Sequence, residues 1–167
     1  VYRAFFEKVD VGEIQDKFRV LMFYGGKLGI CWVADDGEYT DALIGRFEEI
    51  DMEEVERTLA VMRKDFPDLG EAKIRGGQFV QIPVRQPLGV LVADGYAAIG
   101  DCAFMTVPII GSGIANSMKA AKILADVICD DKTESYSAAA LWKYQKEYWT
   151  QIGNSMAPMA AVKLLLT

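Results

Sequence analysis

The feature that most constrains the fold is a run of seventeen residues without a charge, from Cys102 to Met118, which directly follows Asp101. A membrane-spanning helix needs about 20 apolar residues, and this run is shorter. Pro108, Gly111 and Gly113 also interrupt it. We therefore expect no transmembrane segment, and the structure of the run has to be inferred from the elements on either side.

The first part of the chain has the composition of β-strands. Aromatic and β-branched residues concentrate in four segments, 1–9, 17–24, 28–34 and 38–47. The turn-forming triplets GGK and DDG separate three of them. An antiparallel meander is the simplest architecture for such a pattern.

A helix is predicted from residue 51 to 66. Asp51 and Glu54 have the spacing of a capping box, and Pro67 ends the pattern. Apolar residues recur at helical intervals between these limits: Met52, Val55, Leu59, Met62 and Phe66. The spacing indicates an amphipathic helix with one buried face.

Strand character returns in residues 71–84, and two short strands are expected around the Asp94-Gly95 turn. From Gly113 onward the pattern becomes helical. The apolar positions of that helix are Ile114, Met118, Ala121, Ala125 and Ile128, and a later helix at 138–152 has Leu141, Tyr144, Tyr148 and Ile152 on one face. Residues 155–166 can form a further apolar helix.

These elements predict an α+β fold, with a mostly antiparallel sheet covered by helices and a helical C-terminal third. We expect three parts, 1–93, 94–131 and 132–167, packed as one unit. There is no internal repeat, low-complexity segment or evident linker between them.

Composition excludes several classes of function. There are 18 basic and 24 acidic residues, for a net charge of -6, and no run of Lys or Arg, so nucleic acid is not an expected partner. Histidine is absent, which removes the commonest general base and zinc ligand, and we expect no metal site. Three widely spaced cysteines predict neither a disulfide framework nor a redox pair, and favour a reducing, cytoplasmic setting.

The residues after the short strands have a pattern that suits a ligand. A strand leads into Gly100-Asp101, an uncharged loop follows, and Gly111-Ser112-Gly113 opens a helix. A helix N-terminus favours electron-rich oxygens, and a carboxylate at a strand end can accept hydrogen bonds from hydroxyls. The alternative is structural: Asp101 would bond to local backbone groups, and Ser112 would be an ordinary N-cap.

The stretch GYAAIGDCAFMTVPIIGSGIANSMKAAKILADVI, residues 95–128, resembles a known flavin-binding segment. It is similar to the second such segment of FAD-dependent oxidoreductases built like para-hydroxybenzoate hydroxylase, and most closely to the geranylgeranyl reductase family. In that family a Gly-Asp pair ends a strand, a proline follows seven residues after the Asp, and Gly-x-Gly opens a long helix. Gly100-Asp101, Pro108 and Gly111-Ser112-Gly113 match each element.

The resemblance implies FAD as the cofactor. Asp101 would hydrogen-bond the ribitol chain, and the loop from Pro108 to Ala115 would present N–H groups to the pyrimidine edge of the flavin ring. The implied cofactor-binding residues are Gly100, Asp101, Pro108, Gly111, Ser112, Gly113, Ile114 and Ala115. Residues 94–131 would then be the second FAD-binding segment and 1–93 part of a substrate domain. No catalytic side chain is assigned, since the flavin itself carries out the redox chemistry.

A looser resemblance concerns the strand segment YGGKLGICWVADDG, in which Trp32 would match a tryptophan that lines the substrate cavity of geranylgeranyl reductases. The chain departs from the family at Ala34-Asp35-Asp36, where a Phe-Pro pair and a basic residue are frequent. The alternative role for Trp32 is a core aromatic on a strand.

The family's dinucleotide-binding signature, G-x-G-x-x-G after a first strand, is absent, because Gly25–Gly29 has the wrong spacing. The chain begins with Val1 and ends in KLLLT. We therefore expect a piece of a longer protein, whose N-terminal nucleotide-binding half is the partner of this one in the same polypeptide. Alone, the piece is expected to be inactive.

The resemblance implies hydride transfer from reduced flavin to an unsaturated or hydrophobic small molecule, with the electron donor unidentified. A flavin monooxygenase or halogenase, a quinone-linked flavoprotein and a non-enzymatic α+β binding module are the alternatives. The whole protein would be cytoplasmic or lie at the periphery of a membrane. Arg85 could reach an acidic group of the substrate or be an ordinary solvated charge at a strand end, and we favour the second.

Overall fold

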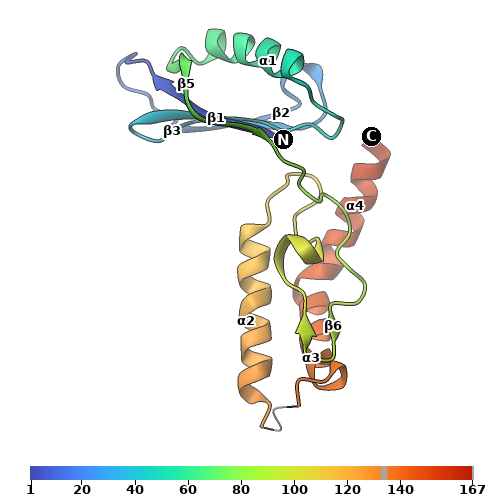
Figure 1. The fold of residues 1–167 in the computed structure, drawn as a ribbon. Helices are drawn as coiled ribbons and strands as arrows, with labels where there is room; N and C mark the ends of the chain where they lie inside the picture. Colours follow the sequence, from blue (N-terminus) through green and yellow to red (C-terminus); the bar gives the residue numbers. More distant parts are fainter. Residues whose placement is uncertain (133–134, 167) are drawn as a thin grey trace. The chain divides into compact units, whose positions relative to one another are not determined.

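A computed structural model describes residues 1–132 and 135–166 of the chain (Figure 1). The chain divides into two compact units, Val1–Gln81 and the part from Ile82 onward, and each is described by itself. The division falls between residues 81 and 82, whereas we expected a boundary between 93 and 94. That the three expected parts pack as one unit stays a prediction.

The first unit is built on a five-stranded sheet in which every pair of neighbours is antiparallel. Its strands are β1 (Tyr2–Lys8), β2 (Phe18–Met22), β3 (Ile30–Asp35), β4 (Tyr39–Ile44) and β5 (Leu69–Phe79), and the short 3-10 helix η1 (Tyr24–Gly26) follows β2. All five lie where the composition predicts strands, and the α+β fold class is confirmed.

The strand order corrects the expected meander. The order is β2-β3-β4-β1-β5, so β1 lies in the interior of the sheet and not at an edge beside β2. Tyr2 is opposite Ile44 of β4 on one side and Phe79 of β5 on the other. The triplets GGK and DDG specify only the β2-β3 and β3-β4 hairpins, and residues 9–17 contain no tight turn that would hold β1 next to β2.

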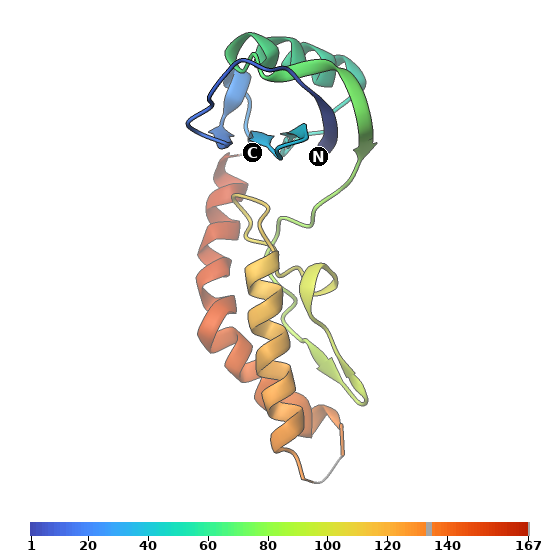
Figure 2. The same cartoon turned by 90° about the vertical axis from the view of Figure 1, so that its left-hand side faces the viewer.

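Helix α1 (Met52–Asp65) covers one face of this sheet (Figure 2). The Asp51 side chain caps it by accepting a hydrogen bond of 2.8 Å from the Glu54 N–H, as predicted. Buried residues of the helix and the sheet form one apolar core: Tyr2, Ala4, Phe6, Cys31, Val33, Ala42, Ile44, Val55, Leu59, Met62 and Leu69. The helix predicted over 51–66 is therefore present, with Phe66 as its C-cap.

The second unit is mainly helical. It contains the short strands β6 (Val92–Ala93) and β7 (Tyr96–Ala97), the 3-10 turn η2 (Gly100–Ala103), and the helices α2 (Ile114–Asp130), α3 (Ala138–Tyr148) and α4 (Asn154–Leu166), with a π-helical turn η3 (Trp149–Gly153) between the last two. The predicted face of α3 is buried, because Leu141, Tyr144 and Tyr148 lie in the core with Ile152.

Helix α2 has two apolar faces, and only one meets this core. Ala120, Ile123 and Val127 are buried, whereas Ile114 and Met118 are 79% and 69% exposed. The apolar positions that the sequence pattern selects, from Ile114 to Ile128, therefore lie largely at the surface of the unit. Helical spacing identifies both faces but does not indicate which of them contacts the rest of the unit.

An ion-pair cluster centred on the buried Glu54 connects α1 to Arg46, which follows β4, and to Lys27, which precedes β3. Its carboxylate accepts hydrogen bonds from Arg46 Nε at 3.2 Å and from Arg57, and Lys27 Nζ lies 3.2 Å away. The side chains of Glu54 and Arg46 are only 9% and 3% exposed. Burial alone would raise the pKa of Glu54, but the hydrogen bonds from Arg57, Lys27 and Arg46 outweigh it and hold that pKa at about 2, below the ordinary 4.5.

This cluster predicts acid sensitivity. Because the folded-state pKa is lower than the unfolded one, the stabilisation is fully present above pH 4.5 and is lost as the pH falls towards about 2. Glu54→Gln leaves Arg46 buried without its charge partner, and we expect a loss of about 3 kcal/mol at pH 7. Urea unfolding at a series of pH values measures both effects.

The variant should also lose less stability than the wild type between pH 4.5 and pH 2. Glu56→Gln, an exposed position on the same helix, is the control and should follow the wild type. A Glu54→Gln profile that runs parallel to the wild type would contradict the assignment.

Candidate functional site

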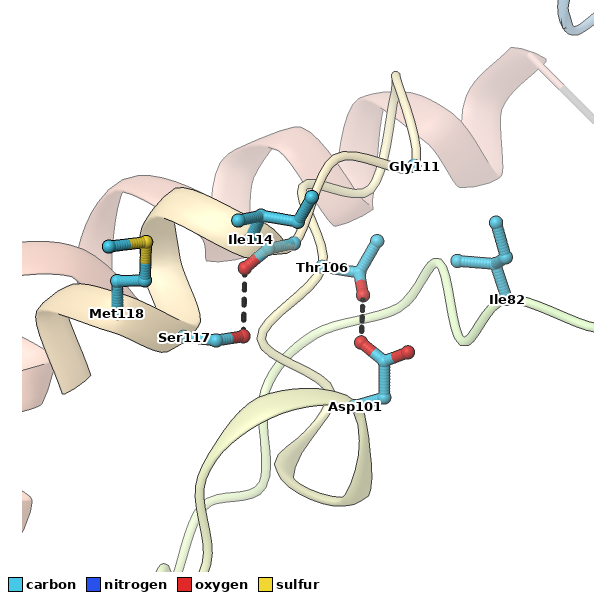
Figure 3. A pocket seen from close by; sticks show the side chains of 8 residues that line it. Ile82, Asp101, Thr106, Gly111, Ile114, Ser117 and Met118 are labelled. Atoms are coloured by element: carbon cyan, nitrogen blue, oxygen red, sulfur yellow. Dashed lines mark hydrogen bonds between the residues drawn. The ribbon is translucent and has the colours of Figure 1, made fainter. Parts of the chain in front are cut away.

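A pocket of about 570 Å³ lies at the N-terminal end of α2, within the second unit (Figure 3). Its lining residues are Ile82, Asp101, Thr106, Gly111, Gly113, Ile114, Ser117 and Met118. In the view of Figure 3, Ile82 lies on one side of Asp101 and Thr106, and Ile114 and Met118 lie on the other. The pocket therefore has apolar walls and a carboxylate between them.

The turn η2 presents the Asp101 side chain to this pocket. Gly100 has a φ of 75°, in the left-handed region that glycine adopts without strain. Its carbonyl accepts from the Met105 N–H at 3.1 Å, and the Asp101 carbonyl accepts from the Phe104 N–H at 3.0 Å. The Gly100 N–H donates in turn to Met105 Sδ at 3.3 Å. These bonds fix the turn and leave Asp101 exposed.

Asp101, Thr106 and Gly113 are closely packed. The Thr106 hydroxyl, which is buried, donates a hydrogen bond of 3.0 Å to Asp101 Oδ1. A Cβ added at Gly113 would stand 3.1 Å from Thr106 Oγ1 and 3.3 Å from Asp101 Oδ1. Glycine at position 113 thus lets both side chains lie against the start of α2. In Figure 3 the second carboxylate oxygen of Asp101 points away from Thr106.

The loop before α2 leaves the helix start without a side-chain cap. The Val107 N–H donates to the Ser112 carbonyl and the Gly111 N–H to the Val107 carbonyl, each at 2.9 Å. The N-cap residue is Gly113, which has no side chain to accept a bond, so the alternative of Ser112 as N-cap is wrong. The first N–H groups of a helix have no intrahelical partner and carry a partial positive charge. They suit an electron-rich oxygen of a ligand.

The expected cofactor residues are only partly brought together in the pocket. Asp101, Gly111, Gly113 and Ile114 line it, whereas Gly100, Pro108, Ser112 and Ala115 belong to the turn, the loop or the helix but are not among the lining residues. A role in holding a cofactor stays a prediction for all eight.

Sequence reasoning missed Ile82, Thr106, Ser117 and Met118. Met118 follows Ile114 by one helical turn and could have been found from that spacing. No spacing pattern in the sequence predicts Ile82 or Thr106, because their proximity to Asp101 depends on the tertiary fold.

Trp32 lies in the first unit, on β3. Its indole N–H donates to Asp41 Oδ2 at 3.1 Å, and the same carboxylate accepts two hydrogen bonds from Arg3 at 3.0 and 2.8 Å. The Arg3 guanidinium also lies 5.5 Å from the Trp32 ring. Trp32 is half-buried and is not part of the core cluster under α1. A contact with substrate stays a prediction.

Within residues 1–132 and 135–166, no group of three or more metal-ligating side chains could hold a metal ion. A search of the same residues finds no helix with the length and apolar character required to cross a membrane.

Two curated reductases are similar in sequence. A digeranylgeranylglycerophospholipid reductase from Methanothrix thermoacetophila is 34% identical over 77 residues, which make up 46% of the chain and 20% of that protein. Digeranylgeranylglycerophospholipid reductase 1 from Methanococcoides burtonii is 30% identical over 105 residues, 58% of the chain and 25% of that protein. The chain thus spans between 20% and 25% of these curated relatives. No model of a protein family matches it.

A solved structure shares the fold. A geranylgeranyl bacteriochlorophyll reductase-like protein from Thermoplasma acidophilum superimposes with a TM-score of 0.74 over 96% of the chain and 41% of that protein, at 23% identity. The two sequence relatives are named as reductases. They confirm the resemblance to the geranylgeranyl reductase family that Gly100-Asp101, Pro108 and Gly111-Ser112-Gly113 indicate, and they support the prediction of an oxidoreductase.

The packing at Gly113 gives a direct test of the site's construction. Gly113→Ala places a methyl group against Thr106 Oγ1 and Asp101 Oδ1 and puts a poor N-cap residue at the start of α2. We expect a loss of about 1–2 kcal/mol in the free energy of unfolding, measured by thermal or urea denaturation.

Gly89→Ala is the matched control, because a Cβ there meets nothing within 4 Å. It should leave the stability unchanged or raise it slightly. Equal effects of the two substitutions would show that the close packing at Gly113 is not required.

Proposed function

We propose that the chain is the FAD-ring-binding and substrate-domain part of a flavin-dependent reductase that reduces carbon–carbon double bonds of a polyprenyl lipid. The observation that carries the proposal is the exposed Asp101 carboxylate, held by Thr106 at an open pocket beside the uncapped N-terminus of α2. The chain spans 20% to 25% of the length of these relatives, and the proposal concerns the whole protein.

The residues of the pocket fit the flavin end of FAD. Asp101 can accept hydrogen bonds from ribitol hydroxyls, and the N–H groups at the start of α2 can donate to the oxygens of the pyrimidine edge. The missing Cβ at Gly113 keeps the backbone accessible between these two groups. Ile114 and Met118, which are 79% and 69% exposed, offer an apolar surface for a flat ring. Reduced FAD, when bound, would supply a hydride to the substrate.

The side chains at the pocket would bind the flavin and orient the groups that contact it. Asp101 is the only ionisable residue among those that line the pocket, so no lining side chain except this carboxylate could move a proton. The Thr106 hydroxyl engages one carboxylate oxygen and thereby fixes the orientation of the other. The walls formed by Ile82, Ile114 and Met118 would limit access of water to the ring.

The rest of the dinucleotide requires a second protein surface. The chain has no G-x-G-x-x-G segment to hold an ADP moiety. The exposed apolar positions of α2, Ile114, Met118 and Ile128, form a face that a neighbouring element could cover. We propose that the nucleotide-binding half of the same polypeptide is that neighbour, and that it completes the FAD site.

The relatives favour reduction over the other flavin reactions. Their names specify reductases and a digeranylgeranylglycerophospholipid, a lipid with unsaturated isoprenoid chains. Monooxygenation, halogenation and quinone-linked electron transfer have no comparable support. A hydrophobic substrate also agrees with an apolar pocket wall, and a membrane-peripheral location would bring the protein to such a lipid.

The proposal predicts that Asp101→Ala in the full-length protein weakens FAD binding about 10- to 100-fold, because a hydrogen bond to a charged group contributes about 1.5–3 kcal/mol. Titration of the flavin-free protein with FAD, followed by flavin fluorescence, measures the loss. Asp101→Asn can still accept the hydrogen bond from Thr106. A loss of affinity in this variant would therefore come from the missing charge and not from a disrupted turn.

Asp126→Ala is the control, because Asp126 is exposed on α2 and pairs with Lys122 at 2.7 Å. It should bind FAD like the wild type. Unchanged affinity in both Asp101 variants would rule out the assigned role, and a wild-type protein that binds no flavin would rule out the proposed function.

A further inference from the structure

Arg85 is the one basic residue in a long stretch around the pocket. Between Arg75 and Lys119 the sequence contains no other Lys or Arg, and the acidic residues there are Asp94 and Asp101. Arg85 is therefore the one cation of the segment that leads into the pocket and forms its loop, and the next basic residues are Lys119 and Lys122 of α2.

The Arg85 segment is attached to the turn that carries Asp101. The Leu88 N–H donates to the Ala103 carbonyl at 3.2 Å. On the other side of Arg85, Ile82 lines the pocket, and Val84 Cγ1 lies 4.0 Å from where a Cβ of Gly111 would stand. Residues 82–88 thus run between the pocket wall and the turn η2.

The Arg85 guanidinium contacts an aromatic ring. The Arg85 Cζ lies 4.7 Å from the centroid of the Phe104 ring, within the range of a cation–π contact. Phe104 has a φ of 55°, a left-handed conformation that is unfavourable for a bulky residue. Glycine would adopt this backbone conformation without strain, whereas phenylalanine adopts it at a cost in conformational energy. The contact of its ring with Arg85 offers a reason for a phenylalanine at this position.

Arg85 has no ion-pair partner among residues 1–132 and 135–166. Its side chain is exposed. A cation–π contact engages the face of the ring and uses none of the guanidinium N–H groups as hydrogen-bond donors. The planar fork of the guanidinium matches two oxygens of a phosphate group.

We propose that Arg85 is a phosphate-binding residue of this site, held in position by Phe104. The inference rests on the proposed function in so far as the pocket takes a flavin. The phosphate belongs either to the flavin nucleotide itself or to a second phosphorylated ligand, such as the lipid substrate. Asp101 would then bind the hydroxyls and Arg85 the phosphate of what the site holds.

The test compares Arg85→Gln with the wild type in the full-length protein. Flavin-free protein is titrated with riboflavin, which has no phosphate, and with FMN and FAD, which have one and two. Flavin-loaded protein is titrated with inorganic pyrophosphate by calorimetry. Lys122→Gln, which removes an exposed cation of α2, is the matched control and should behave like the wild type in both titrations.

If the phosphate is that of the cofactor, Arg85→Gln weakens FMN and FAD binding about tenfold or more and leaves riboflavin unchanged. If it is that of a second ligand, flavin binding is unchanged and the affinity for pyrophosphate falls by a similar factor. Arg85→Lys, which keeps the charge but loses the fork, should fall between the wild type and Arg85→Gln.

The proposal is overturned if Arg85→Gln matches the wild type in every titration, or if riboflavin, FMN and FAD lose affinity equally. Melting temperatures of the variants establish that an observed loss does not come from unfolding. Should the wild type bind no flavin at all, the proposed function fails, while a pyrophosphate titration of the flavin-free wild type and Arg85→Gln still decides whether Arg85 binds phosphate.

Discussion

The contact of Asp101 and Thr106 with Gly113 is the interaction on which the candidate site depends. Because Gly113 has no Cβ, a carboxylate and a buried hydroxyl can approach the first turn of α2. The hydrogen bond between them orients the carboxylate at the pocket. The same glycine leaves the helix start without a side-chain cap. The Asp101 carboxylate, an acceptor, therefore lies next to the unpaired N–H donors of the first turn of α2. This combination suits a ligand with both hydroxyls and electron-rich oxygens.

The local sequence pattern is sufficient to predict those elements whose structure is determined by neighbouring residues. The Asp51 cap, the strands of the first unit and the buried face of α3 were all predictable, because each depends on spacing within one segment. The position of β1 was not, because pairing between distant strands is decided by the packing of the whole sheet. The face of α2 that meets the core was also undetermined, because Ile114 and Ile123 are equally apolar and only the neighbours differ.

The site itself was predictable in part for the same reason. Gly100-Asp101 and Gly111-Ser112-Gly113 were identified from their spacing and from the resemblance to geranylgeranyl reductases. Thr106 could not be found in this way, since its hydrogen bond to Asp101 depends on the left-handed turn at Phe104. The sequence alone favours a solvated charge for Arg85, because its contact with Phe104 joins residues nineteen positions apart.

Hydrogen exchange of the full-length protein, with and without FAD, tests the central claim most directly. If the flavin lies against the loop and the start of α2, the amides of residues 100–118 should exchange more slowly when FAD is bound. The amides of α1, which has no part in the proposed site, should not change and serve as the internal reference. A protein that binds FAD while exchange in residues 100–118 stays the same would contradict the account.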